Sequence, residues 1–242
     1  MHNSIIMQCK KLYMEAFGDD EQFTDLLFDL FFDTSCRYIC CDDKIVSMLF
    51  AIDISLDGYR GKYIYAVATH PDFRGKGYMS RLFDEVSAEF KDQYDFLCLK
   101  PMNEGLFDFY SRLGFIRKFK KSVVNNGDFL GSGLKELTDI TDIKKVRKAL
   151  LIKNYAEYCD DFYKLILSYC TVSVDSFEKP RLFIVAERQS GKIKEVLGEY
   201  EMLPKCYNGS PILIPGDGYD FAMIKYLNDK TFDNGYLGFA LD

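Results

Sequence analysis

The sequence lacks the features that mark several classes of protein. No apolar run approaches the ~20 residues of a membrane span, and no basic stretch followed by an apolar core opens the chain, so we expect a soluble, unsecreted protein without a membrane partner. Only two histidines and no CxxC pair are present, which predicts no bound metal. Lysine and arginine are not clustered and the net charge is −6, which argues against nucleic acid and suits a cationic substrate such as an amine.

The cysteines and the overall composition indicate a globular cytoplasmic protein. Most of the eight cysteines lie inside apolar strand or helix patterns rather than in a loop-rich framework, which predicts reduced thiols in the cytoplasm. A chain of 242 residues with 48% hydrophobic content buries a sizeable core, in one large domain or two small ones.

Residues 65–83 change character twice within one short stretch. The apolar, β-prone residues 63–69 end near Pro71, and residues 74–77, Arg-Gly-Lys-Gly, lead into a helical pattern. Glycines let a backbone approach an anion, and the N–H groups of a first helical turn favour it, so this turn is a candidate pyrophosphate site. It is neither a Walker loop nor a dinucleotide fingerprint, because the spacings GxxxxGK[ST] and GxGxxG are both missing.

Two segments resemble the GNAT superfamily of N-acetyltransferases. Residues 74–79, Arg-Gly-Lys-Gly-Tyr-Met, are similar to its acetyl-CoA loop, Arg/Gln-x-x-Gly-x-Gly/Ala, which also follows a strand and a proline corner. Met79 departs from the usual small residue, as in some two-domain bacterial branches of the superfamily. Residues 103–115 look like the segment Asn-x-x-x-x-x-x-Tyr-x-x-x-Gly-Phe, with these residues in register: Asn103, Tyr110, Gly114 and Phe115. The resemblance covers residues 1–122.

The resemblance implies an α/β (α+β) fold, the GNAT acyl-CoA N-acyltransferase fold, with a mixed, mostly antiparallel twisted sheet flanked by helices. We expect this domain over residues 1–124 and a smaller α+β accessory domain over residues 125–242. The residue patterns predict the following elements of the first domain: helices at 5–17 and 21–32, strands at 37–41, 44–53 and 63–69, a helix after the glycine turn, a strand at 94–100, a helix from 103 and a strand at 115–124. The resemblance further implies that the strands at 94–100 and 115–124 splay apart, and that the gap between the first of them and the strand before the glycine turn admits the pantetheine arm.

The second half is predicted to repeat the order of elements with which the chain opens, two helices followed by a hairpin. Its patterns predict helices from 138 or 139 to 155 and at 157–172, a hairpin of 181–188 with 192–202, and late strands at 221–227 and 236–241. We therefore hypothesise a degenerate, truncated copy of the same fold, with an unrelated α+β cap as the alternative. Neither the repeat nor the unrelated cap is expected to bind CoA, because the second half has no RxxGxG-like turn.

The resemblance implies an acetyl-CoA-dependent N-acetyltransferase, with acetyl-CoA as cosubstrate and direct attack by a primary amine in a ternary complex. The acceptor is a small molecule or a peptide. A non-catalytic CoA-binding regulator or scaffold is the alternative, and a different acyl group is a third possibility. Whether the protein is a monomer or a homodimer stays open.

The same resemblance assigns the site residues. Tyr110 is the expected general acid for the leaving thiolate, with a core-packed tyrosine as the alternative. The residues expected to hold the cosubstrate are Val67, Ala68, Thr69, Arg74, Gly75, Lys76, Gly77, Tyr78, Met79 and Asn103. For Asn103, helix N-capping competes with a bond to the CoA arm.

The general base is not identified by the sequence. His70 titrates near neutrality but precedes a proline at a corner, which favours a loop role. The alternatives are ordered water, Asp53, Tyr65 and the carboxylates of Asp242. Cys98 lies in a strand and is expected to be a buried thiol rather than a nucleophile. The acidic residues that could attract an amine also read as an ordinary solvated helix start: Asp19, Asp20, Glu21 and Asp25.

Overall fold

The computed structural model describes residues 2–124, 133–151, 155–203, 212–233, 235–238 and 241. The chain forms two compact units. The first unit comprises residues 1–117, 157–161 and 223–231, and the second comprises residues 118–156, 162–222 and 232–242. The expected division into 1–124 and 125–242 stays a prediction, and most of its boundary segment, residues 125–132, lies outside the described residues.

The first unit opens with the two expected helices, α1 (His2–Phe17) and α2 (Glu21–Ser35). Asp20 caps α2, because its side chain accepts a hydrogen bond from the N–H of Phe23 at 2.8 Å. Asp25 pairs with Lys10 of α1 at 2.7 Å. Asp19 accepts a hydrogen bond from the Tyr13 hydroxyl, so three of the four acidic residues at this helix start have structural partners.

The sheet of the first unit is mixed and mostly antiparallel, as predicted. Its order is β1-β2-β3-β4-β12, and β7 pairs with β2 off this path. Neighbouring strands along the order are antiparallel except for the parallel pair β3 and β4. The bounds are β1 (Cys36–Cys41), β2 (Lys44–Leu56), β3 (Tyr59–Thr69), β4 (Phe96–Leu99), β7 (Ala156–Tyr158) and β12 (Tyr219–Tyr226). The last of these is the strand predicted at 221–227.

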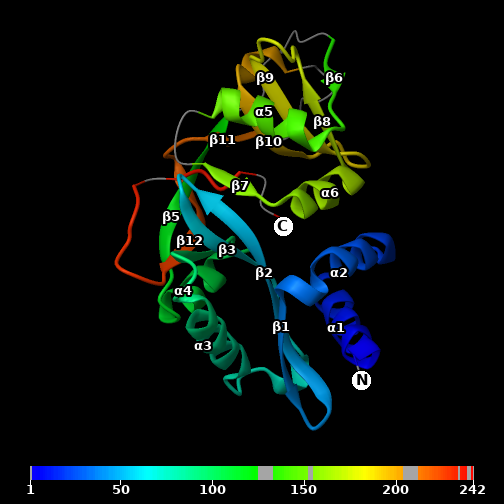
Figure 1. Ribbon diagram of the computed structural model, residues 1–242, viewed down its shortest axis with the longest axis vertical. Helices are drawn as coiled ribbons and strands as arrows, with labels where there is room; N and C mark the ends of the chain where they lie inside the picture. Colours follow the sequence, from blue (N-terminus) through cyan, green and yellow to red (C-terminus); the bar gives the residue numbers. More distant parts are fainter. Residues whose placement is uncertain are drawn as a thin grey trace. The chain divides into compact units, whose positions relative to one another are not determined.

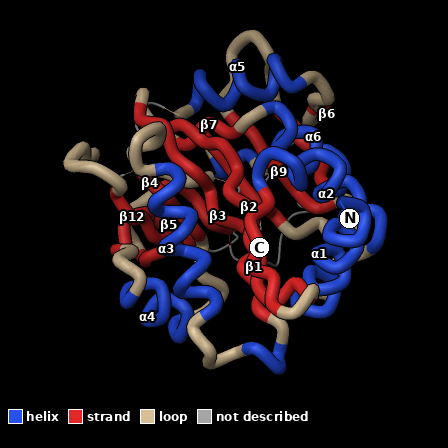
Figure 2. The backbone as a smooth tube through the Cα atoms, turned by 60° about the horizontal axis from the view of Figure 1, so that its bottom comes forward, coloured by secondary structure: helices blue, strands red, loops and turns tan. Residues whose placement is uncertain are grey.

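Helices cover both faces of this sheet (Figure 1, Figure 2). On one face lie α1 and α2, where the ring of Phe28 meets that of Phe50 of β2 edge to face. On the other lie α3 (Tyr78–Phe90) and α4 (Glu104–Arg112). The core between α3, α4 and the sheet is a single cluster that includes Leu49, Ile64, Leu82, Phe83, Phe107 and Phe115. Apolar residues at helical spacing in α3 and at alternate positions in β2 build it.

The second unit has its own sheet and core. Its four-stranded sheet has the order β10-β9-β8-β6, and β5 lies between β12 and β11. The bounds are β5 (Ile116–Val124), β6 (Lys135–Glu136), α5 (Ile140–Leu150), α6 (Asp160–Tyr169), β8 (Cys170–Val174), β9 (Leu182–Glu187), β10 (Ile193–Gly198) and β11 (Ile212–Pro215). Two short 3₁₀ helices complete the chain, η1 (Pro71–Phe73) in the first unit and η2 (Tyr200–Met202) in the second.

Several predicted elements of the second half differ from the structure. The helix predicted to reach residue 155 ends at Leu150, and the strand predicted at 192–202 ends at Gly198, before η2. The helix predicted to reach residue 172 ends at Tyr169, because Cys170–Val174 pairs with β9 and buries Cys170, Val172 and Val174. The strand predicted at 236–241 is, within residues 235–238 and 241, a single bridge between Tyr236 and Tyr155. The interpretation of this half as a repeat stays a prediction.

Candidate active site

A bulge interrupts β3 just before the glycine turn. Tyr65 pairs with Phe50 of β2 and Ala68 pairs with Met48, so Ala66 and Val67 together face Leu49. Ala66 has a φ of 53°, a conformation that residues with a Cβ rarely adopt. The bulge therefore interrupts the regular ladder at Ala66 and Val67, and the ladder resumes at Ala68 and Thr69. This is the place where the resemblance implies that the thioester binds.

The parallel ladder between β3 and β4 covers only the first part of β3. Its pairs run from Gly61 with Phe96 to Tyr63 with Cys98, whereas β3 continues to Thr69. The bulged end of β3 thus lies beyond this ladder, as a gap for an extended ligand arm requires. Cys98 itself is fully buried, and its burial raises the pKa of the thiol, which fits a packed residue rather than a nucleophile.

Ser47 of β2 fastens the bulged end of β3. Its hydroxyl is fully buried, donates to the carbonyl of Ala68 at 3.2 Å and lies 3.0 Å from the Thr69 hydroxyl. The sequence analysis missed this residue, because a serine in an apolar strand gives no signal of a partner 21 positions away.

The glycine turn leaves open space at both glycines. Gly75 has a φ of 72° and Gly77 a φ of 80°, and a Cβ built at either would meet no atom within 4 Å. Glycine is needed there for the left-handed backbone rather than to avoid a clash with the protein. The room beside the turn is thus available to a ligand.

The amino end of α3 follows this turn directly. Gly77 is its N-cap and provides no side-chain acceptor for the first-turn N–H groups. Arg74 donates from Nε to the carbonyl of Thr69 at 3.1 Å, and Lys76 Nζ lies 4.9 Å from the centre of the Phe73 ring. Two cations and a helix amino terminus therefore meet in one short segment, which favours an anion.

Tyr78 and Met79 begin α3 and point toward the protein. Tyr78 Oη donates to the Cys41 sulfur at 3.5 Å, and the Met79 sulfur lies 3.9 Å from the Ser47 hydroxyl. Both side chains pack against the core cluster of α3 and the sheet. A bulky Met79 is thus accommodated on the core side, where it does not fill the glycine turn.

Tyr110 lies on α4 in the same core cluster as Val67 and Met79. Its ring packs edge to face against Phe83 and Phe115, and only 6% of the residue is exposed. Burial raises the pKa of its phenol above the usual value, which keeps the proton on the oxygen at neutral pH. Within the described part of the chain, the structure gives this hydroxyl no hydrogen-bond partner, so it is available to donate to a ligand.

Asn103 caps α4. Its Oδ1 accepts a hydrogen bond from the N–H of Leu106 at 3.1 Å. The structure therefore shows the helix N-cap that was the alternative role for Asn103. A hydrogen bond from the amide NH₂ of Asn103 to CoA stays a prediction.

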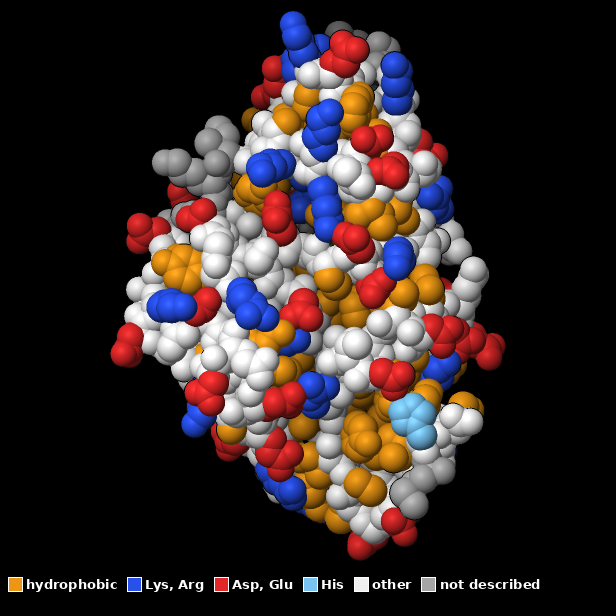
Figure 3. Space-filling model, in the orientation of Figure 1, with side chains coloured by type: hydrophobic (Ala, Val, Ile, Leu, Met, Phe, Trp, Pro, Cys, Tyr) orange, Lys and Arg blue, Asp and Glu red, His pale blue; other side chains and the backbone are white. Residues whose placement is uncertain are grey.

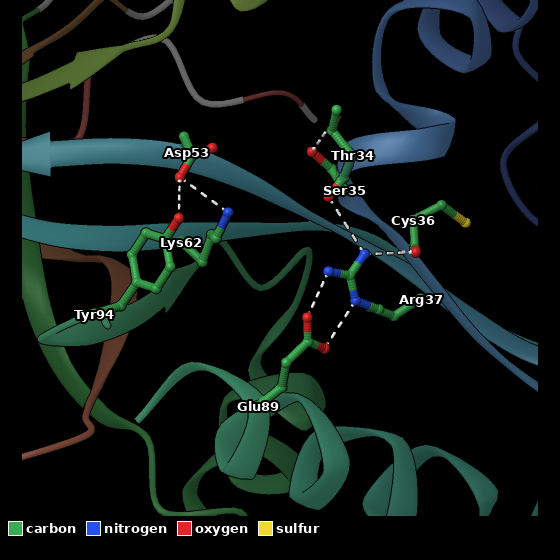
Figure 4. A network of polar contacts seen from close by, with 8 residues as sticks. All are labelled: Thr34, Ser35, Cys36, Arg37, Asp53, Lys62, Glu89 and Tyr94. Carbon is green, nitrogen blue, oxygen red and sulfur yellow. Dashed lines mark hydrogen bonds and ion pairs between the residues drawn. The ribbon is translucent and has the colours of Figure 1, made fainter. Parts of the chain in front are cut away.

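Two of the candidate general bases have structural partners. His70 Nδ1 accepts a hydrogen bond from the N–H of Asp72 at 3.3 Å and thereby caps η1. Asp53 Oδ1 is bound by Lys62 at 2.9 Å and by the Tyr94 hydroxyl at 2.8 Å (Figure 4). Lys62 is buried between sheet and helix, 4.8 Å from the centre of the Phe90 ring.

The carboxylate of Asp53 therefore belongs to the contact between α3 and the sheet. Beside it, Arg37 donates to both oxygens of Glu89, at 2.8 and 2.6 Å (Figure 4). Asp242 lies outside the described residues.

Tyr65 remains as a base candidate with a different environment. Its hydroxyl lies 3.0 Å from that of Tyr13 on α1, and Tyr13 donates to Asp19. Tyr13 was missed in the sequence, because a tyrosine at a core position of an amphipathic helix gives no signal of such a bond.

The described residues show mixed surface charge on the face drawn in Figure 3 and no group placed to hold a metal ion. Figure 3 shows acidic and basic side chains interspersed over the face drawn. Among the residues that the structure describes, no group of three histidine, cysteine, aspartate or glutamate side chains is placed to hold a metal ion. No helix among the described residues is long and apolar enough to cross a membrane.

Comparison with known proteins identifies the first half of the chain. Residues 1–117 match the sequence model described as the acetyltransferase (GNAT) domain. No curated protein matches the chain in sequence.

Several solved structures are similar to nearly the whole chain. A putative acetyltransferase from Pyrococcus horikoshii has a TM-score of 0.67 at 12% identity, covering 97% of this chain and 92% of that one. A GCN5-related N-acetyltransferase from Anabaena variabilis has a TM-score of 0.65 at 14% identity, covering 92% of this chain and 70% of that one. A probable N-acyltransferase from Enterococcus faecalis has a TM-score of 0.63 at 14% identity, with the same coverage of 92% and 70%. At these identities the likeness concerns the fold, while the match over residues 1–117 shows that the chain carries a domain of the GNAT acetyltransferase family.

Proposed function

We propose that the protein is an acetyl-CoA-dependent N-acetyltransferase that transfers the acetyl group to a primary amine by direct attack in a ternary complex. The observation that carries this proposal is the segment from the bulge at Ala66 to the amino end of α3. It combines a strand bulge, two left-handed glycines with open space beside them and a helix start without a side-chain cap. These parts suit a thioester, a pantetheine arm and a pyrophosphate in that order along the chain.

In this proposal the chain's own groups hold the cosubstrate at three places. The N–H groups of Val67, Ala68 and Thr69 bind the thioester carbonyl and the pantetheine amides. The residues of the turn, Arg74 to Met79, bind the pyrophosphate through backbone N–H groups, with Arg74 and Lys76 supplying positive charge. The amide of Asn103 bonds the arm while its carbonyl oxygen caps α4.

Tyr110 is proposed as the general acid. Attack of the amine forms a C–N bond and a tetrahedral intermediate, and collapse of that intermediate breaks the C–S bond and leaves a thiolate. A protonated phenol that donates to this sulfur stabilises the charge as it develops. The raised pKa of Tyr110 keeps the donor in the required form.

The acceptor is proposed to be an alkyl amine, as a small molecule or on a peptide, in the cytoplasm. The seven cysteines among the described residues are free thiols, which supports a reducing compartment. An alkylammonium with a pKa of about 10.4 is rarely neutral at pH 7, which adds about 4.6 kcal/mol to the barrier unless a base removes the proton.

The experiment is thiol release from acetyl-CoA in the presence of a panel of amines: polyamines, amino sugars, amino acids, lysine peptides and free peptide amino termini. Wild type and Tyr110→Phe are compared, with CoA affinity measured for both. We expect Tyr110→Phe to lower turnover at least about tenfold and to leave CoA affinity nearly unchanged. Equal turnover would remove Tyr110 from the mechanism. CoA binding without thiol release from any amine would favour a non-catalytic CoA-binding role.

A further inference from the structure

Two phenols and a carboxylate form a hydrogen-bonded chain on the α1 side of the sheet in the first unit. Tyr65 Oη lies 3.0 Å from Tyr13 Oη, and Tyr13 Oη donates to the carboxylate of Asp19. Tyr13 is fully buried, whereas Asp19 is partly exposed in the turn between α1 and α2. The chain of bonds therefore leads from solvent through the core to β3.

The direction of the hydrogen bonds in this chain is fixed by its last member. An ionised carboxylate only accepts, so the single proton of the Tyr13 hydroxyl is used on Asp19. The bond between the phenols must then be donated by Tyr65 to Tyr13. Tyr65 thus has no proton left to donate, and its oxygen presents lone pairs to any further partner.

The position of Tyr65 matters as much as the direction. It is the residue directly before the bulge of Ala66 and Val67. The bulge leads into residues 67–69, whose N–H groups are proposed to hold the thioester. Tyr65 is 6% exposed, so its environment is almost closed to water. A hydrogen-bond acceptor in such surroundings suits the N–H of an ammonium that must lose a proton before it attacks.

We propose that Tyr65, Tyr13 and Asp19 form the proton relay that deprotonates the acceptor amine, with Tyr65 contacting the amine and the other two acting through it. This inference rests on the proposed acetyltransferase function. The ammonium proton passes to Tyr65 Oη while the proton of Tyr65 moves to Tyr13 and that of Tyr13 moves to Asp19. Asp19 ends as a carboxylic acid and returns its proton to solvent, and the amine keeps the electron pair that forms the C–N bond.

A relay allows a buried tyrosine to accept the proton of the ammonium group. Burial raises the pKa of both phenols above the usual value, so neither is available as a phenolate near neutral pH. In the relay neither phenol has to ionise, because each oxygen releases one proton as it receives another. The negative charge that attracts the proton is that of Asp19.

The test compares two small amines that differ in protonation. Methylamine is almost entirely an ammonium ion at pH 7, whereas hydroxylamine is already neutral. Thiol release from acetyl-CoA is measured with both for wild type, Tyr65→Phe, Tyr13→Phe and Asp19→Asn. We expect each substitution to lower the rate with methylamine by about 100-fold and the rate with hydroxylamine by less than about threefold. A purely structural defect lowers both rates alike, so the ratio of the two rates is the decisive quantity.

Two matched variants make the same chemical changes outside the relay. Tyr38→Phe removes a phenol oxygen from an exposed side chain of β1, and Asp25→Asn removes a carboxylate paired with Lys10. Both are expected to keep the wild-type ratio. Acetyl-CoA binding and thermal unfolding are measured for each variant, which separates a failure of the proposed function from a failure of the relay.

The relay is contradicted if the three substitutions leave the ratio of rates unchanged. It is equally contradicted if the wild type binds acetyl-CoA but releases no thiol with methylamine, whether or not hydroxylamine reacts. If the wild type does not bind acetyl-CoA, the proposed function fails and the relay fails with it.

Discussion

Lys121 is a buried cation of the second unit. It is 2% exposed, donates to the carbonyl of Gly238 at 3.0 Å and lies 3.7 Å from the centre of the Phe221 ring. Burial lowers the pKa of Lys121 to about 8, although Glu195 nearby acts in the opposite direction. Arg147 and Lys194 lower it further, and Arg147 is itself paired with Glu195 at 2.9 Å.

The lowered pKa predicts how stability changes with pH. Between about pH 8 and about pH 10.4 the unfolded chain keeps the Lys121 proton while the native protein has lost it, so the free energy of unfolding rises with pH in this window. We expect wild type to gain about 2 kcal/mol relative to Lys121→Met between pH 7 and about pH 9.5. Urea unfolding of both proteins at the two pH values measures this difference in the free energy of unfolding. The same pH dependence in wild type and variant would show that Lys121 titrates normally.

At the scale of elements, helix α4 carries Tyr110, and the N-cap Asn103 stabilises this helix. Asn103→Ala removes the acceptor for the N–H of Leu106 and is expected to lower the free energy of unfolding by about 1 kcal/mol. Asn103→Asp keeps that acceptor, so its stability is expected to stay within a few tenths of a kcal/mol of wild type. Denaturant unfolding measures both.

The same pair of variants separates capping from ligand binding. Both lack the amide NH₂ that is proposed to donate to CoA, so we expect both to bind CoA more weakly than wild type in a calorimetric titration. Wild-type CoA affinity in Asn103→Asp would reduce Asn103 to a helix cap.

Elements around the glycine turn were predictable from the sequence because their signals are local. The apolar, β-prone run of residues 63–69, two glycines and an apolar stripe through Leu82 and Phe83 predict strand, turn and helix, and the structure confirms each. The start of the helix at residue 21 was predicted in the same way, and Asp20 caps it in the structure. The end of α6 was not, because residues 170–172 fit a helical pattern and a strand equally until their pairing with β9 is known.

At the scale of the whole molecule, contacts distant in sequence were not predictable. The first unit takes in residues 157–161 and 223–231, and β12 pairs with β4 through Met223 and Leu99. Such pairing depends on how the chain folds back and leaves no mark in a local pattern. The proposed relay also depends on a contact between residues distant in sequence, since Tyr13 and Tyr65 are 52 positions apart. The sequence motif predicted a site for acetyl-CoA, and Tyr65 was already a candidate base. The hydrogen bonds that join Tyr65 to Tyr13 and Tyr13 to Asp19 became visible only in three dimensions.

The measurement that tests the central claim most directly is thermal unfolding with and without acetyl-CoA. It compares wild type with Gly77→Glu and with Gly58→Glu, a matched control whose glycine also has a positive φ and open space around it. At 100 times the dissociation constant, a ligand that binds only the native state adds about 2.7 kcal/mol, which raises the midpoint by roughly 5–10 °C.

We expect this rise in wild type and in Gly58→Glu. We expect none in Gly77→Glu, because its side chain puts bulk and negative charge where the pyrophosphate binds. No rise in wild type at millimolar acetyl-CoA, or an equal rise in Gly77→Glu, would contradict the assignment of the glycine turn as the acetyl-CoA site.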